Sequence, residues 1–431
     1  MDFIRQTWAG IRQYPVMAWV SVIGTALSIF LIMVVVMMQQ VKVAPFPPES
    51  NRDRFLHSRF LSIYQPGDGT HYSESNGANA HEYIQKHFKE LKLPEAVTAY
   101  SNADMSGNLT EKGGNTVKVD LGLTDADFWK VFDFTFIEGK PYDKASFDAG
   151  LAEIVLSRSV ARKLFGTTDV VGRDIDLNFA TYKIVGVVED VSTLANSAYA
   201  QVWLPYSSMG IHEEGWPDVK LCGRLNVTIL AKSTDDLDAI HDEYNKRLAE
   251  VNKELQPTRW EVIPRNRPYT QEKDAVGFSS NNEPDLKGAR RQRAIIFIIL
   301  LLVPAINLSS MTESRLRQRV AEIGVRRAFG STRTSIIGRI IGENLLLTLF
   351  AGFLGWLLSV IFAYFCSAFL FSQPFSTTFN PPSVNIGMLV QWSTFFWALL
   401  FCFILNLLSS GIPAWKASRT SIVNAISGHS R

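Results

Sequence analysis

The sequence predicts a membrane protein of four transmembrane helices, with a large α+β extracytoplasmic domain inserted between the first and second helices. Three observations predict it: four long apolar runs, a polar stretch of about 245 residues between the first two, and an uneven distribution of arginine. Asp, Glu, Lys and Arg are absent from all four runs, which are Val16–Met38, Ala294–Met311, Leu345–Phe371 and Gly387–Ile412. Each run is close to the ~17–25 residues that a helix needs to cross the hydrocarbon core.

The chain is predicted to begin with a cytoplasmic interfacial helix at residues 1–15, where apolar residues accompany Arg5 and Arg12. The first span, 16–40, is longer than the apolar core of a signal peptide and lacks a small-residue cleavage site, so we expect an uncleaved anchor. The other predicted segments are an outer domain at 41–289, a second span at 290–311, a cytoplasmic coupling loop at 312–341, a third span at 342–371, a short outer loop at 372–386, a fourth span at 387–412 and a cytoplasmic tail at 413–431.

Basic residues set the predicted orientation, because loops rich in Lys and Arg are retained in the cytoplasm during insertion. Seven arginines and two glutamates occupy the loop Thr312–Arg339, whereas the loop Ser372–Ile386 has no charged residue. Both termini and the arginine-rich loop are therefore predicted to be cytoplasmic. The outer end of the second span contains Arg290, Arg291 and Arg293, which the excess of basic residues on the cytoplasmic side would not predict. Long translocated domains largely do not follow this charge rule.

The outer segment is predicted to be an α+β domain. Strand patterns rich in β-branched residues occur at 115–123, 152–157, 182–191, 201–205 and 226–232. Helical patterns occur at 80–91, 157–165 and 233–254. The segment has a single cysteine, Cys222, so we expect a hydrophobic core rather than an internal disulfide to stabilise it. The proline-rich stretch Ala44–Ser50 is predicted to be an extended linker.

The arginine-rich loop is predicted to form a helix, a glycine stop and a second helix. The first helix covers Glu313–Phe329, Gly330 suits the left-handed conformation that ends a helix, and Ser331 is the predicted cap of the next helix. Two interpretations are open: an anchor on anionic lipid, or a docking surface for a cytoplasmic partner. Gly324 favours docking, because a glycine inside a helix costs about 0.5–1 kcal/mol relative to alanine.

The sequence lacks the motifs of ATP hydrolysis and of proteolysis. The phosphate-binding pattern GxxxxGK[ST] does not occur, and its nearest approach, Gly166–Arg173, has the wrong spacing and no lysine. The stretch His81–His87 does not match HExxH, and a GxSxG elbow is absent. Zinc-type spacing of Cys and His is also absent. We therefore predict that the chain is not an enzyme and holds no catalytic residue, metal or cofactor of its own.

Two helical-region stretches and four segments of the outer domain resemble the FtsX/MacB-like family of ABC-transporter permeases. EIGVRRAFGSTRTSI, which begins at Glu322, is similar to the family segment E-I-G-x-R-R-A-x-G-A-S/T-x-x-x-I. IPAWKASRTSIVNAI, which begins at Ile412, resembles the family's closing P-A-x-x-A-x-x-x-P-x-x-A-L, with Ser or Ile where proline is common. Outer segments that begin at Asp127, Glu153, Val171 and Tyr182 resemble the MacB-type periplasmic core domain.

The resemblance implies that the loop is a coupling helix seated in a groove of a separate ATPase subunit, which would itself bind ATP and magnesium. The residues of this chain that match the family's coupling segment, and to which the resemblance assigns contact with the ATPase, are Glu322, Ile323, Gly324, Arg326, Arg327, Ala328, Gly330 and Ser331. The resemblance also implies a bacterial inner-membrane location with the large domain in the periplasm. It implies a homodimer or a heterodimer with a related permease and, for an exporter, a periplasmic adaptor and an outer-membrane channel. Membrane lipid is an expected partner and nucleic acid is not.

Small residues at four-residue spacing predict close helix packing around the third span. Gly338 and Gly342, then Ala351 and Gly355, follow that spacing, with Gly352 beside them. The alternative is the ordinary glycine content of membrane helices. Glu343, at the inner end of the third span, is predicted to be a coupling or anchoring residue rather than a proton relay.

Three classes of function are open at this point. The main prediction is an export permease for antibiotics, peptides or lipids, in which motion of the ATPase reaches the outer domain. The second is a transducer that regulates an extracytoplasmic partner such as a cell-wall hydrolase, although its outer domain is usually much smaller; a lipoprotein-release permease is a further relative. The third is a membrane-anchored sensor or adhesin that uses no ATPase.

Overall fold

A computed structural model describes most of the outer segment and part of the helical segments. The described residues are 15–67, 73–102, 105–217, 219–277, 279–300, 302, 325, 328–372, 384, 386–390, 392, 395–397, 399–400, 403–404 and 407. They fall into two compact units, an outer unit built from Val41–Lys287 and a helical unit built from segments on either side of it.

Six strands of the outer unit pair in a closed ring. In ring order they are β6 (Thr116–Thr124), β11 (Val202–Pro205), β8 (Glu153–Ser157), β10 (Ala180–Val188), β9 (Asp174–Leu177) and β5 (Ser106–Thr110). The pairs β11–β6 and β10–β8 are parallel and the other ring pairs are antiparallel. Because the ring is closed, none of these strands has a free edge within it, and the side chains inside the ring are shielded from water. Val119, Ile154 and Ile184 are accordingly fully buried.

The same sheet continues beyond the ring from β6. The added strands are β4 (Ala96–Ser101), β13 (Asn226–Leu230), β1 (Phe55–Ser58) and β15 (Tyr269–Thr270), while β7 (Phe136–Gly139) pairs with β10. A second sheet contains β12 (Cys222–Gly223), β3 (Ser73–Asn79), β2 (Leu61–Gln65) and β14 (Glu261–Ile263). Strand β1 is therefore bordered by β13 and β15, and it is buried at all four positions.

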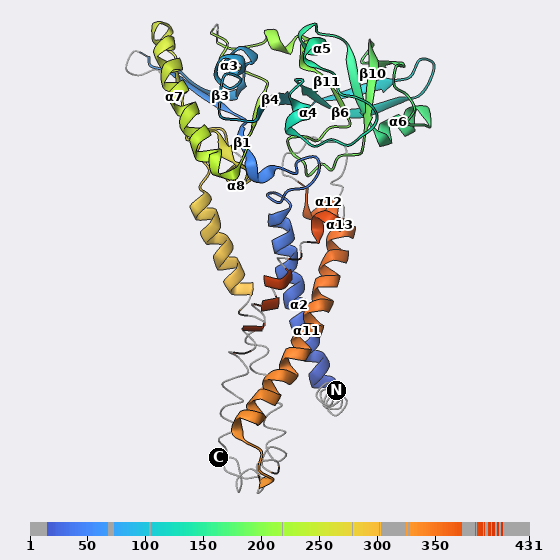
Figure 1. Cartoon of the computed structure of the whole chain (residues 1–431), viewed down its shortest axis with the longest axis vertical. Coiled ribbons are helices and arrows are strands. Elements are labelled where there is room, and N and C mark those ends of the chain that lie inside the picture. The colour runs from blue at the N-terminus through green and yellow to red at the C-terminus, as the bar shows by residue number, and fades with distance from the viewer. Residues whose placement is uncertain are drawn as a thin grey trace. The chain divides into compact units, whose positions relative to one another are not determined.

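Helices cover both sheets. They are α3 (His81–His87), α4 (Phe128–Val131), α5 (Lys144–Asp148), α6 (Arg158–Phe165), α7 (Leu237–Leu255) and α8 (Gln271–Asp274). Short 3-10 turns are η1 (Arg52–Arg54), η2 (Tyr206–Met209), η3 (Ile211–Glu213), η4 (Thr234–Asp236) and η5 (Gln256–Thr258). The long helix α7 lies beside α3 (Figure 1), and Phe88 stacks on Tyr244 with ring centroids 4.8 Å apart.

The strands predicted from β-branched residues are confirmed as β6, β8, β10, β11 and β13, and the three predicted helices as α3, α6 and α7. Helix α3 is shorter than predicted and ends at His87. The prediction of an extended linker at Ala44–Ser50 is wrong. This stretch forms turns, and its Phe46 and Glu49 side chains are buried. It folds onto the domain because Arg52 binds back to it, as described below.

The helical unit contains α2 (Pro15–Gln40), α11 (Arg333–Phe365), α12 (Ser367–Leu370) and α13 (Ile386–Leu389), and residues 286–300 are also helical. Within the described residues, Val22–Gln40 and Thr334–Phe365 are long and apolar enough to cross a membrane. The predicted third span runs to Phe371, but α11 ends earlier, at Phe365, and α12 follows. Residues 301 and 303–311 of the predicted second span, half of the fourth span, residues 1–14 of the predicted interfacial helix and the cytoplasmic tail at 413–431 lie outside the described residues.

Candidate functional site

The chain that leaves the first helix is held by a buried arginine. Arg52 is 1% exposed and donates from Nε to Glu49 Oε2 (2.6 Å). Its Nη1 donates to the carbonyl oxygens of Val41 (2.8 Å) and Ala44 (3.1 Å), and its guanidinium lies 4.1 Å from the centre of the Phe46 ring. The planar guanidinium thus ties together the residues that directly follow α2, because it can donate in several directions at once.

Glu49 extends this contact to a distant loop. Its second carboxylate oxygen, Oε1, accepts hydrogen bonds from the backbone N–H groups of Ser197 (2.8 Å) and Ala198 (3.0 Å). Arg52 Nη2 reaches the same loop by donating to the Leu194 carbonyl (2.7 Å). A buried ion pair persists only where hydrogen bonds satisfy both ions, and here both are satisfied.

A second set of contacts joins α8 to the same stretch of chain. Gln271 Nε2 donates to the Lys42 carbonyl (2.8 Å), which leaves Gln271 Oε1 to accept from His57 Nε2 on β1 (2.7 Å). His57 Nδ1 then accepts from the Thr228 hydroxyl (3.1 Å). Burial lowers the pKa of His57, which favours this neutral tautomer. Beside it, Arg59 pairs with Asp274 of α8 at 2.7 Å.

These contacts define what we call the junction: Lys42, Glu49, Arg52, His57 and Gln271. In sequence, Lys42 follows α2, and Gln271 precedes the helix at 286–300. The junction therefore fixes the two chain segments that lead to helices onto one core strand, β1.

Within the helical unit, α2 and α11 pack closely at small residues. Val22, Ala26, Leu347 and Ala351 form a buried cluster. A Cβ added at Gly355 would lie 2.4 Å from the Ala26 carbonyl oxygen, and one added at Gly352 would lie 2.5 Å from Leu399 Cδ2. The same atom at Gly338 would meet nothing within 4 Å. Of the glycines predicted to pack, Gly352 and Gly355 thus permit close approach and Gly338 does not, while Gly342 and Glu343 are half-buried.

The predicted coupling residues are only partly described. Ala328 is helical and exposed, and Gly330 has φ +90°, the left-handed conformation that ends a helix. The predicted cap at Ser331 is wrong by one position: Thr332 caps α11, and its side-chain oxygen accepts from the Ser335 N–H (3.3 Å). Glu322, Ile323, Gly324, Arg326 and Arg327 lie outside the described residues.

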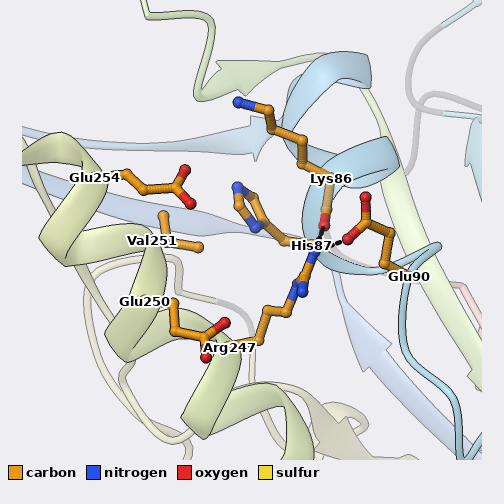
Figure 2. Close-up of a pocket in the computed structure, with 7 residues that line it drawn as sticks. All are labelled: Lys86, His87, Glu90, Arg247, Glu250, Val251 and Glu254. Atoms are coloured by element: carbon orange, nitrogen blue, oxygen red, sulfur yellow. Dashed lines mark hydrogen bonds and ion pairs between the residues drawn. The ribbon is translucent and has the colours of Figure 1, made fainter.

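A cavity of about 220 Å³ opens between α3 and α7. Its lining is Lys86, His87, Glu90, Arg247, Val251, Glu250 and Glu254 (Figure 2). Arg247 is bound to Glu90 and to the Lys86 carbonyl, whereas the His87 ring projects from α3 toward Glu254. Among the described residues no group of three or more His, Cys, Asp or Glu is placed to hold a metal ion.

The cavity makes stability depend on pH. Burial, then the charges of Arg247 and Lys86, lower the pKa of His87 from 6.5 to about 4. The unfolded chain therefore binds more protons between these values, and the stability contributed by neutral His87 is complete above pH 6.5 and lost as pH falls toward 4. We expect His87→Gln to unfold with less acid sensitivity than the unmodified chain, measured by urea midpoints at pH 7 and pH 4.5. His241→Gln, on α7, is the control and should keep the full acid loss.

Sequence reasoning missed the junction. Its residues are spread from Lys42 to Gln271, and no local pattern links them. The one available signal was Glu49 and Arg52 at i, i+3 beside prolines, a spacing that usually marks an exposed pair. The predicted coupling and packing residues, in contrast, came from motifs and spacing.

Two family models match the chain. One, described as a MacB-like periplasmic core domain, matches residues 20–247, and one described as an FtsX-like permease C-terminal matches residues 294–422. The macrolide export ATP-binding/permease protein MacB of Escherichia coli strain K12 is 22% identical over 327 residues, which cover 75% of this chain and 45% of that protein. The protein of the same name in Shigella flexneri has the same identity and coverage. The chain thus spans less than half the length of these relatives.

Two solved structures each match about half of the chain. The extracellular domain of the noncanonic ABC-type transporter YknZ from Gram-positive bacteria gives a TM-score of 0.32 at 16% identity, covering 47% of this chain and 99% of that one. The periplasmic region of MacB from Actinobacillus actinomycetemcomitans gives 0.33 at 15% identity, covering 48% and 88%.

Proposed function

The chain belongs to the permease family that joins a MacB-like periplasmic core domain to an FtsX-like permease region, and from this premise we propose that it carries motion from an ATPase to its outer unit. The ATPase is a separate subunit that binds ATP and magnesium. The work is done by the outer unit, outside the cytoplasm. Both termini are cytoplasmic, and two copies, or this chain and a related permease, pair around the ATPase.

The junction is the observation that carries this proposal. An outer unit that receives motion needs a stiff connection to the segments that move. Arg52 and Gln271 supply it, because each binds the chain that directly follows α2 and also a distant part of the outer unit. A flexible linker of the same length would instead absorb the motion as local bending.

The cytoplasmic end of the pathway is the coupling loop. We assign ATPase docking to Glu322, Ile323, Gly324, Arg326, Arg327, Ala328, Gly330 and Ser331. The left-handed Gly330 and the Thr332 cap allow a sharp turn into α11, so a displacement of the docked segment is passed directly to a long helix. Close packing of α11 on α2 at Gly355 then moves both helices together.

Export is the proposed outcome of this motion, with antibiotics, peptides or lipids as the classes of cargo. Two observations support this outcome: the MacB relatives are macrolide export proteins, and the outer unit is large. A transducer that activates an extracytoplasmic enzyme would need only a small outer domain. A sensor or adhesin without an ATPase would have no use for the coupling motif.

We expect Arg326→Glu with Arg327→Glu to weaken association with the ATPase roughly 10–100-fold, because two attractive charges at the docking surface become repulsive. Co-purification of the tagged full-length chain from mild detergent measures the effect. Arg290→Glu with Arg291→Glu makes the same change in charge outside the loop and should retain the ATPase. Equal ATPase retention by both double variants would show that the loop does not bind the ATPase. A chain that never retains an ATPase would refute the permease function.

A further inference from the structure

The lining of the cavity between α3 and α7 contains a buried imidazole that the fold leaves without a hydrogen bond. His87 is 7% exposed, and its Nδ1 has no hydrogen-bond partner in the described part of the chain. A buried polar group without a hydrogen bond costs free energy, so native structures contain few of them. The ring projects from α3 toward Glu254 of α7 (Figure 2). A ligand group between these two side chains can use the imidazole.

The charges of the lining favour a cation. Arg247 is already paired with Glu90. The side chains of Glu250 and Glu254 are exposed, and neither carboxylate forms an ion pair within the residues that the structure describes. The remaining base of the lining, Lys86, belongs to α3 and projects away from Glu250 (Figure 2). Two carboxylates without a counter-ion attract a cation and repel an anion.

An organic ammonium fits this cavity better than a metal ion does. Among the described residues, no group of three or more His, Cys, Asp or Glu is placed to hold a metal. Val251, which is 2% exposed, lies between Glu250 and Glu254 and gives the cavity an apolar wall (Figure 2). The volume of about 220 Å³ is below the ~300–1,000 Å³ of sites for drug-sized ligands, so the ligand is smaller than these.

The two carboxylates set the length of the ligand. Glu250 and Glu254 are four residues apart on α7. A helix rises about 6 Å over four residues, and the nitrogens of an extended four-carbon diamine are also about 6 Å apart. The methylene groups between these nitrogens can pack on Val251. Burial, then nearby positive charge, lowers the pKa of His87 to about 4, so at pH 7 its neutral ring can accept a hydrogen bond from an ammonium group.

We propose that the cavity between α3 and α7 binds a short aliphatic diamine. One ammonium group lies between His87 and Glu254, and the other pairs with Glu250. The bound diamine contacts both helices and therefore stabilises their packing. The inference does not rest on the proposed function, because it requires neither an ATPase nor a particular orientation in the membrane.

Calorimetric titration of the full-length chain in detergent with 1,4-diaminobutane, at pH 7 and low salt, tests the proposal. Butylamine has one ammonium group and should bind roughly 10–100-fold more weakly, because it makes no charged hydrogen bond to Glu250. Glu254→Gln should weaken diamine binding by a similar factor. Asp242→Asn removes a carboxylate of α7 that does not line the cavity, and should change the affinity by less than about threefold.

Two further variants separate the two ends of the ligand. Glu250→Gln should weaken binding of 1,4-diaminobutane and leave butylamine binding unchanged, whereas His87→Leu should weaken binding of both amines. Thermal unfolding without ligand shows that each variant is folded, and the diamine should raise the unfolding temperature of the unmodified chain but not of Glu254→Gln. Lack of diamine binding at millimolar concentration, equal affinity for butylamine, or unchanged diamine affinity of Glu254→Gln would each overturn the proposal.

Discussion

Replacing Arg52 with methionine should destabilise the outer unit by about 3–5 kcal/mol, the cost of leaving one member of a buried ion pair without its counter-ion. Both side chains are 1% exposed, so water cannot replace the lost guanidinium beside Glu49. The Val41, Ala44 and Leu194 carbonyls lose their hydrogen-bond donor in the same substitution. The segment that follows α2 should therefore separate from the domain.

Chemical unfolding of the full-length chain in detergent, followed by tryptophan fluorescence, measures this loss. Arg224→Met removes an exposed arginine whose nearest partner, Glu214, lies at 3.7 Å, and should change the free energy of unfolding by less than about 1 kcal/mol. The double variant Arg52→Met with Glu49→Leu should recover much of the stability, because it leaves no buried charge. If Arg52→Met unfolds at the same denaturant concentration as Arg224→Met, the junction does not hold the segment.

Gly355→Ala should weaken the packing of α2 on α11 by about 1–3 kcal/mol, the usual effect of inserting a methyl group into a filled interface. The added Cβ would lie 2.4 Å from the Ala26 carbonyl oxygen, and backbone cannot move aside as a flexible side chain can. Inside a helix, alanine is more favourable than glycine by about 0.5–1 kcal/mol. A net loss of stability in this variant would therefore come from the steric overlap of the added Cβ with the Ala26 carbonyl oxygen.

Gly338→Ala is the matched control on the same helix. Its Cβ meets nothing within 4 Å, so only the helix propensity changes and the variant should be slightly more stable. Unfolding of the full-length chain in mixed micelles with increasing dodecyl sulfate gives both free energies. Similar shifts for the two variants would mean that α2 and α11 do not approach at Gly355.

Local sequence patterns predicted the strands whose residues favour β structure by themselves. Strands β8 and β10 are rich in Val and Ile, and this composition predicts them, whereas the sequence of β3, SESNGAN, does not predict a strand. Strand β3 forms because β2 and β12 supply its hydrogen-bonding partners on either side, and such pairing outweighs weak intrinsic propensity.

In the candidate site, too, local sequence predicts one part and only tertiary contacts decide the other. The coupling loop was predicted because its residues are consecutive and match a family segment, and Gly330 adopts the expected left-handed conformation. The composition of the proline-rich stretch predicts a linker, because composition indicates flexibility and carries no information that Arg52 binds back to Val41 and across to Leu194.

By itself, the sequence determined the apolar runs, the α+β character of the outer unit and the motif that places the chain in its family, because each depends on residues close together in the chain. Only the tertiary structure decided that Glu49 and Arg52 are a buried pair and that Gly355 touches α2 while Gly338 does not. These properties depend on desolvation and contact between residues far apart in sequence, and hydropathy or spacing along the chain does not contain that information.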